Sequence, residues 1–205
     1  MRPGTRIQGL FALVLALAIP ATAWCGGAAR RHDGFLLRLS AGFGGASTDI
    51  EANDGTDIEF SGMTGDVNFA IGGMVSRNLA LHGTLWGWSI GDPDVEVGGD
   101  SGELDGDLSM SAIGIGITYY FMPTNLYLSG SLGMGLLTWD LEGFGDDDSD
   151  RGLVLDATFG KEWWVSANWG LGLAGAVGFH SIPQDNFDDN WDGASLGLRF
   201  SATFN

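Results

Sequence analysis

The 205-residue sequence has few basic residues, one cysteine and no apolar run long enough to cross a membrane as a helix. Only nine Lys and Arg stand against 26 Asp and Glu, giving a formal net charge of −17. Such a surface excludes nucleic acid as a partner, because phosphates are bound by Lys and Arg. Cys25 is the single cysteine, so an intramolecular disulfide framework is excluded too. No segment reaches the 18 or more consecutive apolar residues expected of a membrane-spanning helix.

The N-terminal region has the three parts of a secretory signal peptide. Arg2 and Arg6 carry positive charge, an apolar run covers residues 10–19, and the small residues Ala21-Thr22-Ala23 follow it. This layout predicts export through the inner membrane with cleavage after Ala23. We therefore expect a signal peptide at 1–23, an N-terminal periplasmic tail at 24–33 and one barrel domain at 34–205.

Apolar residues alternate with small or polar residues through much of the remaining chain. In one clear example Ile113, Ile115 and Ile117 are separated by Gly114 and Gly116. A period of two predicts strands with one apolar face. On this pattern we predict eight strands, at about 34–44, 60–75, 79–90, 107–121, 125–138, 152–165, 169–181 and 193–204.

The connections between these strands alternate between short and long. Three are short, at 76–78, 122–124 and 166–168, and contain the Pro, Asn and Ser typical of tight turns. The long ones hold, within them or directly beside them, 22 of the 26 acidic residues. Short turns at one end and long loops at the other are typical of outer-membrane barrels. We therefore predict an all-β fold, an eight-stranded antiparallel up-and-down transmembrane β-barrel, with long loops at 45–59, 91–106, 139–151 and 182–192.

A soluble barrel, with the apolar face inside, is the alternative. It is disfavoured because the opposite face is mostly Gly, Ala, Ser and Thr, whereas a water-facing surface carries more Lys and Glu.

The chain resembles the small bacterial outer-membrane barrels of the OmpA/OmpX-like and opacity-protein type. The resemblance rests on the alternating strands, the segment GKEWWVSANWGLG at 160–172 and the C-terminal strand LGLRFSATF at 196–204. It implies a monomer in the outer membrane, surrounded by lipid and lipopolysaccharide and inserted by the barrel-assembly machinery. It implies no cofactor, and no peptidoglycan-binding domain is expected. Phe204 is penultimate, whereas such barrels commonly end on an aromatic residue.

Aromatic residues beside the short turns fit an interfacial girdle: Tyr119, Phe121, Trp163 and Trp169.

The face opposite the lipid carries a set of ionisable and polar residues. The first and last strands must adjoin when the barrel closes, so Arg38 and Arg199 should lie near one another. Buried charges need partners, and three carboxylates are available. The set forms either a polar plug, which the narrow lumen of an eight-stranded barrel favours, or a gated ion path. We call it the polar network: Arg38, Asp66, Asn68, His82, Asp156, Glu162 and Arg199.

No catalytic residues are predicted. Enzymes that act on lipid acyl chains exist on this scaffold, but the adjacent His180 and Ser181 should point to opposite faces of a strand. Metal binding is not predicted either, because the densest acidic run lacks the spacing of an EF-hand loop. Its members are weak candidates for divalent cations: Asp146, Asp147, Asp148 and Asp150.

The sequence therefore predicts a surface-exposed outer-membrane barrel with a structural or surface-interaction role, of the kind that includes surface antigens. A narrow, porin-like channel for ions or small solutes is the alternative, and a lipid-modifying enzyme ranks third.

Overall fold

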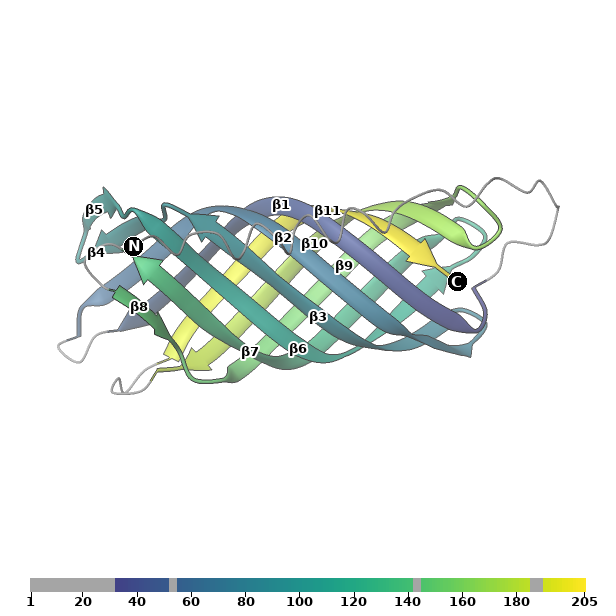
Figure 1. Cartoon of the computed structure of the whole chain (residues 1–205), viewed down its shortest axis with the longest axis horizontal. Coiled ribbons are helices and arrows are strands. Elements are labelled where there is room, and N and C mark those ends of the chain that lie inside the picture. The colour runs from purple at the N-terminus through teal and green to yellow at the C-terminus, as the bar shows by residue number, and fades with distance from the viewer. Residues whose placement is uncertain (1–31, 52–54, 142–144, 185–189) are drawn as a thin grey trace, which may run out of the picture.

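A computed structural model describes residues 32–51, 55–141, 145–184 and 190–205. Eight long antiparallel strands form a closed barrel, because the first strand pairs with both the second and the last (Figure 1). No helix in these ranges is long and apolar enough to cross a membrane. The predicted strand number and up-and-down order are confirmed. The long strands are β1 (Phe35–Glu51), β2 (Asp57–Ser76), β3 (Leu79–Gly91), β6 (Gly106–Phe121), β7 (Leu126–Leu141), β9 (Gly152–Trp164), β10 (Trp169–Pro183) and β11 (Asn190–Phe204).

Three short strands extend the barrel wall at the end that carries the long connections, which we call the loop end. The strand β4 (Asp94–Val97) pairs with the start of β2, and β5 (Asp100–Glu103) pairs with β4. The strand β8 (Gly145–Asp148) pairs with the end of β7. The opposite end, which we call the turn end, carries the three tight turns and the C-terminus (Figure 1).

The strands at the loop end are longer than the sequence predicts, and part of the predicted 45–59 loop is sheet. There the period of two continues, with Ile50 and Phe60 buried inside and Asp49 and Glu59 exposed outside. The acidic residues gave this stretch the composition of a loop, although only the outward face is acidic.

The predicted signal peptide and most of the predicted tail lie outside the described residues. Residues 185–189 of the predicted 182–192 loop also lie outside the described residues, whereas 182–183 and 190–192 belong to β10 and β11.

Large apolar side chains cover the outside of the barrel between its two ends. Ile113, Ile115 and Ile117 are 54–68% exposed, and similar residues point outward from every long strand. A water-soluble protein rarely exposes an apolar surface of this extent, so this band faces lipid and the soluble alternative is wrong. Further members of the band include Phe43, Val67, Ile71, Leu85, Leu132, Leu155, Phe159, Leu173, Phe179, Leu198 and Phe200.

Placing a charge within this band should destabilise the inserted barrel. Ile115 lies opposite Gly83 and Leu132 on the neighbouring strands and is 68% exposed. We expect Ile115→Arg to cost about 2–4 kcal/mol, since a charged side chain would replace an apolar one near the membrane midplane. Urea unfolding of the protein in lipid vesicles measures this cost. Ile115→Leu is the control, and an arginine variant as stable as the leucine variant would show that this face does not contact lipid.

Candidate functional site: the lumen and the loop end

The inward-facing side chains divide the lumen into two zones. Polar and charged residues fill the half nearer the turn end, and apolar residues fill the half nearer the loop end. This division follows from the strands, because each long strand contributes alternate residues to the interior.

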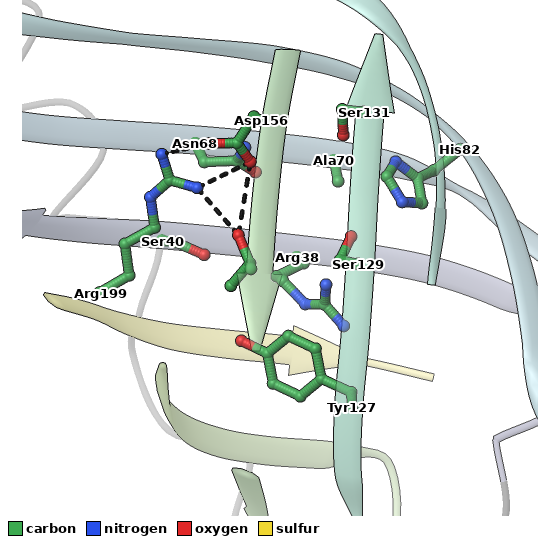
Figure 2. Close-up of a pocket in the computed structure, with 11 residues that line it drawn as sticks. Arg38, Ser40, Asn68, Ala70, His82, Tyr127, Ser129, Ser131, Asp156 and Arg199 are labelled. Carbon is green, nitrogen blue, oxygen red and sulfur yellow. Dashed lines mark hydrogen bonds and ion pairs between the residues drawn. The ribbon is translucent and has the colours of Figure 1, made fainter. Parts of the chain in front are cut away.

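Arg199 on β11 occupies the centre of the polar zone, held between two carboxylates. Its Nε and Nη2 donate to Oδ1 and Oδ2 of Asp66, at 2.5 and 2.7 Å. Its Nη1 and Nη2 also lie 2.9 and 2.8 Å from Oδ1 and Oδ2 of Asp156 (Figure 2). Thr158 Oγ1 accepts a further bond from Nη1 at 3.1 Å. The guanidinium group is therefore saturated by partners from β2 and β9.

The strand register explains why Arg199 meets Asp66. Gly42 on β1 lies directly opposite Arg199 on β11 and directly opposite Asp66 on β2. Because Gly42 has no side chain, the two charged groups can meet across the intervening strand.

Arg38 on β1 forms a second ion pair nearer the turn end. Its Nη2 lies 3.3 Å from Glu162 Oε1 and donates to Tyr120 Oη at 2.6 Å. The guanidinium carbon lies 4.3 Å from the centre of the Tyr127 ring, within the range of a cation–π interaction. Thr203 Oγ1 donates to the same Glu162 oxygen at 2.7 Å. Each of the two arginines thus has its own carboxylate partners.

The two remaining members of the polar network do not form ion pairs. His82 is buried, and its Nε2 lies 3.1 Å from Thr118 Oγ1. Asn68 and His82 both line a cavity of about 10 Å³ between Arg38 and Arg199 (Figure 2). The structure thus groups all seven predicted residues in one half of the lumen.

His32 closes the turn end of the lumen, a contact that the sequence did not predict. Its ring stacks on Tyr120 with centroids 3.5 Å apart and lies 4.9 Å from the Trp164 ring. Its Nε2 lies 2.6 Å from Asn125 Oδ1, and His32 is buried. A lone histidine in a predicted tail offers no sequence signal for this position.

The other half of the lumen is filled by what we call the loop-end apolar cluster. Trp86 and Trp88 on β3 form its inner layer and are only 5% and 4% exposed. The tip of the Trp86 ring lies against Gly133 on β7, where any side chain would collide with it. Both tryptophans share the inward-facing side of β3 with His82. The other members of the cluster are Ala46, Ile50, Phe60, Ile90, Leu108, Met110, Ala112, Leu137, Leu141, Val154, Ile182 and Trp191.

Outside the barrel, the loop end carries rows of carboxylates across neighbouring strands. Asp49 on β1 lies directly opposite Asp192 on β11 and Glu59 on β2. Glu59 in turn lies opposite Glu96 on β4. All four are exposed, so like charges stand side by side on one outward surface. Across the barrel, a shorter row pairs Asp107 on β6 with Asp140 on β7.

Comparisons with known proteins agree with the fold. No protein-family model matches the chain, and no curated protein sequence matches it either. The structure of OprG from Pseudomonas aeruginosa aligns with 87% of this chain and 100% of its own, at 17% identity and a TM-score of 0.46. Neisserial surface protein A aligns with 83% of this chain and 96% of its own, at 13% identity and a TM-score of 0.51. OmpT, an outer-membrane protease of Escherichia coli, aligns with 84% and 96%, at 9% identity and a TM-score of 0.45.

At such identities the likeness shows the fold alone. The location follows from the band of lipid-facing side chains on a closed barrel, because closure leaves no strand edge exposed to lipid. The protein is a barrel of the bacterial outer membrane. Its interior, unlike that of a wide porin, is occupied by its own side chains.

The residues that the sequence analysis considered for catalysis and for metal binding lie in different parts of the barrel. His180 points inward, where its Nε2 lies 2.9 Å from Thr48 Oγ1, and Ser181 points to the opposite face. Within the described ranges, no three His, Cys, Asp or Glu side chains could share a metal ion. Asp147 and Asp148 lie exposed on β8, Asp150 follows it exposed, and the side chain of Asp146 lies outside the described residues.

Proposed function

We propose that this protein is a closed outer-membrane barrel that acts through the acidic surface of its loop end. The observation that carries the proposal is the filling of the lumen, in which an apolar cluster adjoins a polar network. An eight-stranded barrel is only wide enough for side chains, and here they occupy it. An ion path is disfavoured, because the side chains of the loop-end apolar cluster pack across the lumen and the two polar residues beside it, His180 and Thr48, are hydrogen-bonded to each other.

The acidic rows favour a cationic partner. Carboxylates directly opposite each other on paired strands destabilise a sheet, by roughly 0.2–1 kcal/mol for each pair. Asp49, Glu59 and Glu96 stand in such a row at the edge of the lipid-facing band. In our proposal the loop end faces the outside, where lipopolysaccharide phosphates are bridged by divalent cations. The carboxylates would bind the same cations, which join the barrel to the headgroups.

A catalytic role is not part of the proposal. The three histidines in the described region lie within hydrogen-bond distance of Asn125, Thr118 and Thr48. A monomer is proposed because the closed wall offers no long strand of the barrel for pairing with a second copy.

Neutralising one acidic row should weaken cation-dependent binding of lipopolysaccharide. We expect the barrel in lipid nanodiscs to bind lipopolysaccharide several-fold more tightly with Mg²⁺ than with EDTA. The triple variant D49N/E59Q/E96Q should lose most of that difference, since only Asp192 of this row would remain charged. Because repulsion is also removed, the variant should unfold at a higher temperature than the wild type in EDTA.

The matched control is D100N/E103Q/D105N, which removes three exposed acids outside this row. Its Mg²⁺ dependence should match that of the wild type. Equal losses in both variants would mean that only net charge matters, and no dependence on Mg²⁺ in the wild type would refute the proposed surface role.

A further inference from the structure

We propose that Lys161 binds the headgroup of one anionic phospholipid in the leaflet that surrounds the turn end. Lys161 lies on the outside of β9, at the opposite end of the barrel from the acidic rows. The inference therefore does not depend on the surface role proposed above.

The first argument is the position of a single charge on the lipid-facing surface. Lys161 lies between Phe159 and Trp163, which point outward and are 57% and 51% exposed. Leu126 on β7 and Leu173 on β10 lie directly opposite it. Among the outward-facing residues that the structure describes between the acidic rows and the tight turns, Lys161 is the only charged one. A charge on a surface that is otherwise apolar is costly, and such a charge usually has a partner.

The second argument is the placement of the ammonium group. Its Nζ donates to the carbonyl oxygen of Thr124 at 2.9 Å, in the tight turn between β6 and β7. It also lies 5.8 Å from the centre of the Trp163 ring, within the range of a cation–π interaction. Both contacts hold the ammonium toward the turn end, at the level of the aromatic girdle, where lipid headgroups begin. An ammonium group has three N–H donors, so the bond to Thr124 leaves two for oxygen atoms of a lipid.

The third argument is the missing negative charge. Within the described residues no carboxylate forms an ion pair with Lys161, and the buried carboxylates are paired with Arg38 and Arg199 inside the lumen. Glu162 is adjacent in sequence but points to the opposite face of β9. The carbonyl group and the indole ring supply only partial charges. A full negative charge must therefore come from outside the chain.

The chemistry of the leaflet identifies the partner. A phospholipid phosphate sits at the depth of the girdle and offers oxygen atoms to the two remaining N–H donors. Phosphatidylglycerol carries a net negative charge, whereas phosphatidylethanolamine brings an ammonium group of its own, so the anionic lipid complements Lys161 better. The acyl chains of the bound lipid would lie along the outward side chains of Phe159 and Leu173, nearer the membrane midplane.

The test is native mass spectrometry of the full barrel, released from micelles that contain equal amounts of the two phospholipids with the same acyl chains. We expect the wild type to retain one phosphatidylglycerol molecule several-fold more often than one phosphatidylethanolamine molecule. Heating in detergent gels checks that each protein compared is in its compact form.

Lys161→Gln removes the charge but keeps an N–H donor for the Thr124 carbonyl, and it should lose the preference for phosphatidylglycerol. Lys161→Arg keeps the charge and should retain most of the preference. Arg77→Gln is the matched control, because it removes one positive charge from an exposed turn at the same end of the barrel. It should bind the two lipids as the wild type does.

Equal retention of the two lipids by the wild type would overturn the proposal. So would an undiminished preference in Lys161→Gln, since the anionic lipid would then bind elsewhere on the barrel. A loss of the same size in Arg77→Gln would also overturn it, because only the net charge of the turn end would matter. None of these results bears on the binding of Mg²⁺ and lipopolysaccharide at the loop end, which is measured separately.

Discussion

Replacing Arg199 with alanine should lower the stability of the barrel by about 3–5 kcal/mol, because the buried carboxylate of Asp156 and the largely buried carboxylate of Asp66 would lose their shared partner. Asp66 and Asp156 both contact this guanidinium group at 2.5–2.9 Å. The loss should appear as a lower urea midpoint in vesicles and as earlier loss of the compact form on heating in detergent gels.

Arg77→Ala is the control for this effect. Arg77 lies exposed in the tight turn between β2 and β3, where losing a charge should cost at most about 1 kcal/mol. If the two variants had equal stability, the ion cluster would contribute nothing to holding the barrel. Arg199→Ala should also leave the barrel non-conducting, since the loop-end apolar cluster remains in place.

Replacing Trp86 with alanine should destabilise the barrel by about 3–5 kcal/mol and make it leaky to small ions. Truncating a buried tryptophan removes apolar contacts and leaves a cavity. Here the cavity would lie next to Gly133, which has no side chain to fill it. Urea unfolding measures the stability, and single-channel current recording in planar bilayers measures the ion conductance.

Trp163→Ala is the matched control, because Trp163 points outward and is 51% exposed. It should leave the bilayer recording unchanged. If the Trp86→Ala variant were as stable as the wild type and conducted no ions, the tryptophan layer would not be what closes the lumen.

The strands and their faces could be predicted because apolar residues alternate with small or polar residues along the sequence, with a period of two. Ile113, Ile115 and Ile117 point outward as that period requires, and Arg38 and Arg199 point inward. The inward direction of Trp86 follows from the same rule, whatever the register between strands.

The pairing inside the lumen could not be predicted, because it depends on the register between strands. The sequence offers Arg199 three carboxylates, and only the alignment of Gly42 with both Arg199 and Asp66 selects among them. His32 precedes the first strand, so no periodicity places it on Tyr120.

The loop-end apolar cluster was missed for a different reason. Ile50 and Phe60 alternate with carboxylates, and the acidic composition concealed the strand that carries them. The sequence predicted a polar plug or a gated ion path from the polar network, and the structure shows in addition that apolar packing closes the half of the lumen nearer the loop end.

The most direct test of a closed barrel is the conductance of the purified wild-type protein in planar bilayers. We expect no stable conductance steps, at either polarity of the applied voltage, while Trp86→Ala under the same conditions does conduct. Reproducible single-channel steps from the wild-type protein would contradict this account and assign the lumen to transport.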